Sequence, residues 1–269
     1  MKRSTPIALA IGTTATAAAV YWRLRGERLR LERLAAAGLE ALLNAIDAND
    51  ADTGAHVRRV ASYALVLARA ADLNEHQCRS VERVALFHDI GKIHAALFDI
   101  VRDHDKLSPD ERRLIATHTA RGAEVLTPFA MFYPDLGAGV LSHHERWDGT
   151  GYPRGLAGED IPLPARIVAI ADSFDAMTHR RRYRREKSLP DALSAIAEGR
   201  ETQFDPDLVD CFLSPPIIGE TRVAMRHHYG PKRARGNRRS ASVERKEVPD
   251  VTFRWRRGSA VKRTRSLMK

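Results

Sequence analysis

The sequence predicts an all-α fold: a helical bundle with a metal centre in its core, preceded by an N-terminal helix and followed by a disordered tail. Apolar residues recur at spacings of three and four, as in amphipathic helices, and no segment alternates as a half-buried strand does. Aromatic residues make up only 6% of the 269 residues, whereas hydrophobic residues make up 43%. Candidate metal ligands fall on several of these helices, which is how metal sites are built inside bundles.

An apolar run at the N-terminus, Pro6–Trp22, predicts a membrane anchor over residues 1–28. The run is close to the shortest length that spans a bilayer. Basic residues are more numerous after it than before it, and this bias places the bulk of the chain on the cytoplasmic side. Two alternatives stay open. One is a cleavable signal peptide, since residues 17–19 are small alanines, and the other is an Ala-rich soluble helix or leader.

Residues 29–46 predict a linker helix that leads into the main domain. Its apolar positions recur near every third or fourth residue; they are Leu31, Leu34, Leu39, Leu42, Leu43 and Ile46. An amphipathic helix of this kind can pair with a second copy of itself, so we expect a homodimer through the N-terminal helix. The run is too short to establish a coiled coil.

The formal charge of +10 belongs to the tail and not to the domain. Residues 221–269 hold sixteen Lys and Arg against three acidic residues, so they carry +13 and the preceding 220 residues carry −3. This distribution argues against nucleic acid as a partner of the domain. The tail, residues 216–269, has little apolar periodicity and is predicted to be disordered. Two distant cysteines, Cys78 and Cys211, indicate a reducing compartment.

The adjacent residues His88 and Asp89 are the strongest functional signal. An imidazole beside a carboxylate suits first-row divalent ions such as iron or manganese, and a bridging carboxylate lets two ions share a site. Taken singly, each candidate has an ordinary structural explanation, so the prediction rests on their joint occurrence. The candidate ligands are His56, His88, Asp89, His118, His143, His144 and Asp172, with Asp52, one helical turn before His56, as a further candidate.

These residues lie in motifs that resemble the HD-GYP phosphodiesterases, a branch of the HD hydrolase superfamily. An HD pair alone is a weak signal, whereas HHE-x-x-DGTGYP at this distance from HDIGK is specific. The resemblance covers residues 47–212, within an expected domain of residues 47–215. The matching stretches are Thr53–Val60, His88–Ile93, His118 with Gly122, His143–Pro153, Gly155–Leu163, Ala171–Thr178 and Phe204–Pro206.

The resemblance implies hydrolysis of the bacterial second messenger cyclic di-GMP to linear pGpG, and often on to GMP. It also implies that the seven candidate ligands hold two divalent metal ions, or three, with Asp89 bridging. Family members with a third ion generally have Glu where Asp52 stands, and Asp is shorter, so two ions are the expectation. Asp89 and Lys92 would be catalytic, and Lys92 would contact the scissile phosphate. The residues expected to contact the dinucleotide are Lys92, Tyr152, Arg181 and Arg184.

The resemblance also implies a partner, and the N-terminal apolar run implies a location. The loop formed by Gly151, Tyr152 and Pro153 would dock diguanylate cyclase (GGDEF) domains. With its anchor, the protein would act at the cytoplasmic side of the bacterial inner membrane; without it, in the cytoplasm. The chain departs from the family pattern after Lys92, where the usual proline is missing, and at Arg182, which replaces a proline. These changes bear on loop shape and substrate affinity.

The expected chemistry follows from the residue types. Two metal ions neutralise phosphoryl oxygens and lower the pKa of a bridging water. Lys92, one turn beyond Asp89, adds positive charge where negative charge develops. Arginines could bind the second phosphate through paired hydrogen bonds, unless the arginine run at residues 180–185 is only a solvated helix end. Two other functions stay open: another HD-type nucleotide phosphohydrolase, and a receptor that binds cyclic di-GMP with little or no cleavage.

Overall fold

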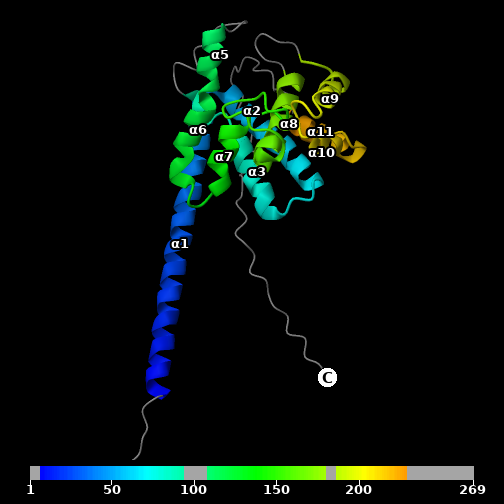
Figure 1. Cartoon of the computed structure of the whole chain (residues 1–269). Helices are drawn as coiled ribbons and strands as arrows, with labels where there is room; N and C mark the ends of the chain where they lie inside the picture. The colour runs from blue at the N-terminus through cyan, green and yellow to red at the C-terminus, as the bar shows by residue number, and fades with distance from the viewer. Residues whose placement is uncertain (1–6, 94–107, 180–185, 229–269) are drawn as a thin grey trace, which may run out of the picture. The chain divides into compact units, whose positions relative to one another are not determined.

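The computed structural model describes residues 7–93, 108–179 and 186–228, whose regular structure is helical (Figure 1). β-Pairing within these ranges is limited to isolated bridges, so the predicted all-α fold is confirmed. The longer helices are α1 (Ile7–Asn49), α2 (Ala51–Ala70), α3 (Glu75–Phe87), α5 (Pro109–Ala116), α6 (His118–Leu126), α7 (Pro134–Ser142), α8 (Leu163–Thr178), α9 (Leu189–Glu198), α10 (Pro206–Phe212) and α11 (Pro215–His228). Short 3-10 helices are η1 (Ile90–Ile93), η2 (Thr127–Phe129) and η3 (Gly158–Asp160).

The core forms around α2, which packs against α1, α3, α8 and α11 (Figure 1). Val60, Ala64 and Leu67 are fully buried because they recur every three or four residues along one face of α2. Phe174 of α8 meets this face, with its ring edge-on to that of Tyr63 at 5.2 Å between centroids. Truncating a buried phenylalanine to alanine costs about 3–5 kcal/mol. This packing fixes the spacing of α2 and α8, which both carry candidate ligands.

Capping side chains specify where several helices begin. Asn74 and Gln77 form a capping box at the start of α3, and Ser108 and Glu111 form another at the start of α5. The Asp50 carboxylate caps α2 by accepting the backbone N–H of residue 52. Each cap satisfies N–H groups that have no partner within the helix and contributes about 1 kcal/mol. A defined first residue sets which face each later side chain occupies.

A single helix, α1, covers most of the stretch that the sequence divided between a membrane anchor (1–28) and a linker helix (29–46). Its C-terminal part packs on the bundle, with Ala35, Leu39 and Ile46 buried. The large apolar side chains in residues 20–34 are exposed. Within the described ranges, no helix is long and apolar enough to cross a membrane. The predicted anchor therefore gains no support, and residues 1–6 lie outside those ranges.

The tail expected to be disordered from residue 216 begins instead with a helix, α11. Ile217 and Thr221, four residues apart, are buried, and α11 packs against α2. The prediction of disorder is wrong for residues 216–228 because the arginine-rich composition of the whole tail concealed this short apolar face. Residues 229–269 lie outside the described part of the chain.

The turn after α3 passes very close to the start of α6. A Cβ atom on Gly91 would lie 2.0 Å from the His118 carbonyl oxygen and 2.7 Å from the Gly122 amide nitrogen. Both neighbours are backbone atoms, so only glycine fits at position 91 without displacing one element from the other. This contact brings Asp89 and Lys92, on either side of Gly91, against the helix that carries His118.

Candidate metal centre

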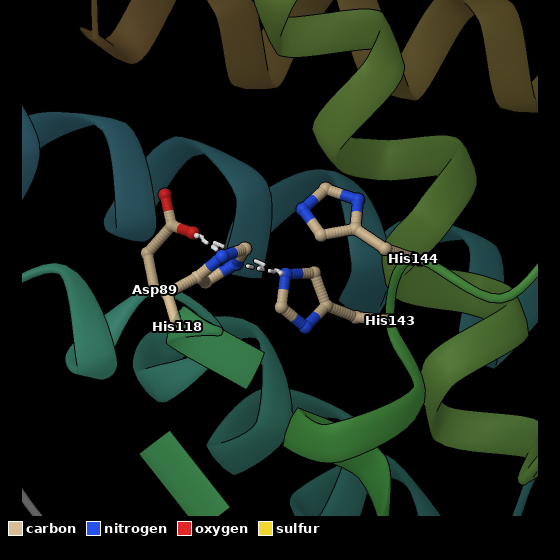
Figure 2. Close-up of side chains that lie close together, drawn as sticks. All are labelled: Asp89, His118, His143 and His144. Atoms are coloured by element: carbon tan, nitrogen blue, oxygen red, sulfur yellow. Dashed lines mark hydrogen bonds and ion pairs between the residues drawn. The ribbon is translucent and has the colours of Figure 1, made fainter. Parts of the chain in front are cut away.

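The seven candidate ligands converge from five separate segments of the chain into two groups of side chains. Within each group the potential ligand atoms lie within 4.8 Å of one another. Figure 2 shows the first group, in which two histidines from the end of α7 face the Asp89 carboxylate and the His118 ring. The first group is Asp89, His118, His143 and His144, and the second is His56, His88 and Asp172.

Asp89 lies between the two groups. Its Oδ2 atom is 3.4 Å from His88 Nε2 and 3.9 Å from His56 Nε2. Its Oδ1 atom is 3.4 Å from His118 Nε2 and 3.9 Å from His143 Nε2. Each oxygen of one carboxylate thus faces a different set of imidazoles, which is the arrangement that a bridging ligand requires.

Helix ends orient three of the imidazoles. His88 and His143 are the C-terminal caps of α3 and α7, and His118 is the first residue of α6. Each donates its Nδ1–H to the backbone carbonyl three residues earlier, at 2.8, 2.6 and 2.7 Å respectively. Carbonyls in the last turn of a helix lack helical partners. These bonds fix the tautomer and leave each Nε2 lone pair directed into the site.

His56 is held differently, by a carboxylate from another helix. Its Nδ1 atom lies 2.7 Å from Asp175 Oδ2, and its Nε2 atom lies 3.3 Å from Asp172 Oδ1. Arg59 donates to both Asp175 oxygens, at 2.7 and 3.0 Å. Neither Asp175 nor Arg59 was predicted to have a role at the site. The available signal was spacing: each lies three residues after a candidate ligand, on the same helix face.

Burial and charge keep the imidazoles of the first group neutral. Burial, with the nearby Lys92 ammonium, lowers the pKa of His118 to about 4 and that of His144 to about 3. Burial, together with the neighbouring His144, also holds the pKa of His143 well below its ordinary value. Neutral imidazole is the form that binds metal ions.

The Asp89 carboxylate is ionised, and the pKa of His56 is raised. Burial alone would raise the pKa of Asp89, but Lys92 and His88 outweigh burial and hold it well below its usual range. The Lys92 Nζ atom lies 2.7 and 2.8 Å from the two oxygens of Asp89. Burial is outweighed at His56 as well, where hydrogen bonds to Asp172 and Asp175 raise the pKa to about 9.

Both groups carry nitrogen atoms that a cation would satisfy. The His88 Nε2 atom is buried and has no hydrogen-bond partner in the described part of the chain. His118 Nε2 and His143 Nε2 lie 3.2 Å apart, and since both rings use Nδ1–H as donor, two lone pairs face each other. Buried acceptors without donors are costly. The donor set of imidazoles and carboxylates therefore fits divalent first-row metal ions.

A loop after α7 lies against the first group. The Tyr152 ring is 5.0 Å from the His144 ring between centroids. Buried Glu145 holds the loop by accepting the backbone N–H groups of Arg154 and Leu156, at 2.8 and 3.0 Å. The peptide bond between residues 152 and 153 is cis. Glu145 lies within the quoted motif, yet its structural role was not predicted because its partners are backbone groups.

Asp89 and Lys92 also line a pocket near the junction of α1 and α2. Its other lining residues are Ile46, Asn49, Asp50, Thr53, Val57 and Ile93. The pocket adjoins both Asp89 and Lys92. Its walls combine apolar side chains with amide, carboxylate and hydroxyl groups.

One predicted ligand, Asp52, is not brought into this cluster. Asp52 is an exposed residue in the first turn of α2 and belongs to neither ligand group. Although helix α2 does extend back to it, as its proposed role requires, its carboxylate is not gathered with the others. Arg181 and Arg184 lie outside the described residues.

Comparison with known proteins identifies the family. A sequence profile described as HD domain matches residues 40–208. The cyclic di-GMP phosphodiesterase response regulator RpfG of Xanthomonas campestris pv. campestris is 39% identical over 176 residues, covering 65% of this chain and 46% of the relative. The 3'3'-cGAMP-specific phosphodiesterase 2 of Vibrio cholerae is 35% identical over 173 residues, covering 64% and 33%. This chain thus spans less than half the length of either relative.

A solved structure supports the fold. The HD domain of the L. monocytogenes phosphodiesterase PgpH, in complex with cyclic-di-AMP, superposes with a TM-score of 0.51 at 20% identity, covering 71% of this chain and 97% of that one. The identification made from the sequence motifs is confirmed. Because the matching profile extends over more than half of the sequence and includes both ligand groups, the chain belongs to the HD domain family.

Proposed function

We propose that this chain is a metal-dependent phosphodiesterase that hydrolyses cyclic di-GMP to linear pGpG, and onward to GMP. The observation that carries this proposal is the Asp89 carboxylate, whose two oxygens face separate imidazoles, His88 and His118, at 3.4 Å each. One carboxylate shared by two nitrogen-rich groups suits two divalent ions, an arrangement found in enzymes that cleave phosphodiesters. Relatives named as cyclic di-GMP phosphodiesterases support the choice of substrate.

The proposed site holds two metal ions, and these are iron or manganese. The seven grouped residues would be the ligands, with Asp89 shared. Three imidazoles with one carboxylate in the first group, and two imidazoles with carboxylates in the second, match the borderline preference of these ions. A third ion held by Asp52 is not favoured, because that carboxylate belongs to neither group.

Lys92 and Tyr152 would contribute to the reaction besides the metal ions. When bound, the ions neutralise phosphoryl oxygens and lower the pKa of coordinated water. Lys92 would balance negative charge that develops on the phosphoryl group, since its ammonium is already beside Asp89. Burial, with the charges of Asp89 and Asp172, raises the pKa of Tyr152 above its ordinary value. Its hydroxyl therefore stays protonated and can donate a hydrogen bond to a phosphate oxygen of the dinucleotide.

Activity measurements on anaerobically purified, metal-replete protein test the proposal. We expect cyclic di-GMP to be converted to pGpG or GMP. The Asp89→Ala variant should lose about 10³-fold or more in turnover, because the shared ligand of both groups is gone. Asp110→Ala, which removes an exposed carboxylate outside the site, should keep wild-type activity. Product identification by chromatography, with metal analysis of the same sample, provides the readout.

Other outcomes would select a different function. Preferred cleavage of 3'3'-cGAMP would place the chain with the cGAMP-specific relatives, which match it nearly as well. Hydrolysis of a nucleoside triphosphate with cyclic di-GMP untouched would identify another HD-type nucleotide phosphohydrolase. Tight binding of cyclic di-GMP without product would identify a receptor.

Further binding roles accompany the proposed activity. Arg181 and Arg184 are proposed to bind the dinucleotide, and the loop of residues 151–153 to dock diguanylate cyclase (GGDEF) domains, on the resemblance alone. A homodimer through α1 is supported by its exposed apolar side chains, among them Leu24 and Leu31. Attachment to the cytoplasmic side of the bacterial inner membrane through residues 1–28 rests on the sequence pattern alone.

A further inference from the structure

His56 differs from three other site histidines in what holds its ring. His88, His118 and His143 donate Nδ1–H to carbonyls of the last helical turn before them. His56 lies in the interior of α2, a helix that continues from Ala51 to Ala70. Carbonyls there accept helical hydrogen bonds from residues four positions later, so His56 has no free carbonyl within its own helix. Its Nδ1–H needs an acceptor from elsewhere in the fold.

Asp175 supplies that acceptor from α8. The carboxylate is 1% exposed, and its Oδ2 atom lies 2.7 Å from His56 Nδ1. Arg59, one turn after His56, binds both carboxylate oxygens, and His179 Nδ1 lies 3.0 Å from Oδ1. The carboxylate is therefore fixed on three sides, and its position fixes the plane of the His56 ring. With Nδ1 engaged, Nε2 points toward Asp172 and Asp89.

We propose that Asp175 is a positioning residue that determines how tightly the His56, His88 and Asp172 group binds its metal ion. This role rests on the metal-dependent function proposed above. A carboxylate behind a ligating imidazole fixes the ring orientation and makes its lone pair a stronger donor, and losing such a partner lowers metal affinity about 10- to 100-fold. The first group lacks this dependence, because helix-end carbonyls hold His118 and His143.

The test is the affinity of the full-length protein for Mn²⁺, measured for each ion by competition with a chelating indicator. In Asp175→Asn we expect one of the two ions to bind about 10- to 100-fold more weakly and the other to bind as in the wild type. Arg59→Gln leaves the carboxylate on His56 but frees it from the guanidinium, so the same ion should weaken by a smaller factor.

Asp205→Asn provides the matched control. Asp205 is also a buried carboxylate paired with an arginine, since its Oδ2 atom accepts from Arg166 Nη1 at 2.7 Å, and it caps α10 away from the ligand groups. A general loss of packing would act alike in both variants, whereas a positioning role affects one ion in Asp175→Asn only. Both ions should therefore bind to Asp205→Asn with wild-type affinity.

Clear results would overturn the inference. Unchanged affinity for both ions in Asp175→Asn would do so, as would equal losses for both ions in that variant and in Asp205→Asn. Should Asp175→Asn fail to fold, unchanged affinities in Arg59→Gln would overturn it instead. A wild-type protein that binds two ions but cleaves no cyclic dinucleotide would contradict the proposed function and leave this inference standing. Binding of fewer than two ions would contradict both.

Discussion

Three histidines of the site differ in charge because their neighbours differ. Hydrogen bonds to Asp172 and Asp175 overcome the effect of burial on His56 and raise its pKa to about 9. The pKa values of His118 and His144 fall to about 4 and about 3, because burial and Lys92 disfavour the cation. Near neutral pH without metal, His56 is therefore charged, and the other two are neutral.

The charge of His56 predicts how the stability of the metal-free protein varies with pH. Its pKa in the folded state is above the ordinary value of 6.5, so the folded state binds the proton more tightly than the unfolded state does. This stabilisation is complete below pH 6.5 and is lost as the pH rises toward 9. We expect the melting temperature of chelator-treated protein to fall between pH 6.5 and 9, as measured by calorimetry.

Two variants control this measurement. His56→Gln removes the titrating group and should flatten the curve over that interval. His76→Gln, which changes an exposed histidine at the start of α3, should retain the wild-type slope. A wild-type melting temperature that rises from pH 6.5 to 9 would contradict a charged His56.

The sequence predicted the seven residues of the two groups but not the residues that hold their side chains in place. These candidate ligands lie in short motifs whose residue types are unusual together, so they could be proposed without knowledge of the fold. Asp175 is 119 positions from His56, and only the packing of α8 on α2 brings the two together. Glu145 acts on backbone N–H groups, which carry no sequence signal. Asp52 had the right spacing, yet spacing alone did not bring its carboxylate to the cluster.

At the scale of elements, the contact between η1 and α6 positions Asp89 against His118. Gly91→Ala would place a methyl group 2.0 Å from the His118 carbonyl oxygen, and backbone atoms cannot rotate away. We expect a loss of unfolding free energy of about 1–3 kcal/mol or more, as in overpacked cores, and fewer bound metal ions per chain. Chemical denaturation and metal analysis measure the two effects.

Gly219→Ala is the matched control for this variant. Gly219 lies within α11, and an added Cβ there would meet nothing within 4 Å. Alanine should stabilise a helix interior by about 0.5–1 kcal/mol relative to glycine, with metal content unchanged. Equal stability of Gly91→Ala and the wild type would show that η1 can shift without cost.

Helix content was predictable, but helix extent was less so. Apolar periodicity and capping residues such as Ser108 and Asn74 are local signals, and they mark helices correctly. Helix α11 was missed because its apolar face is short and the surrounding composition is strongly basic. Such a helix depends on packing against α2, a tertiary contact that outweighs local composition.

At the scale of the whole molecule, α1 provides the surface for the proposed homodimer. Leu24 and Leu31 are seven residues apart, so they lie on one face, and both are at least half exposed. Glutamate at both positions should abolish self-association, because it would bury charge in an apolar contact. Sedimentation velocity over a range of protein concentrations measures this.

Leu29→Glu is the control for the helix face. Leu29 is also exposed, but it points about 140° away from Leu24 around the helix axis. Self-association should survive this change. A monomeric wild-type protein at all concentrations, or equal effects of substitutions on both faces, would contradict pairing through this face.

The continuity of α1 also has a mechanical consequence. No turn interrupts the helix between Trp22 and Ile46, so a regular ladder of backbone hydrogen bonds about 36 Å long joins these positions. Ile46 and Asn49 form part of the wall of the pocket beside Lys92. A rotation of α1 about its own axis near Trp22 would therefore also displace Ile46 and Asn49, which form part of that wall.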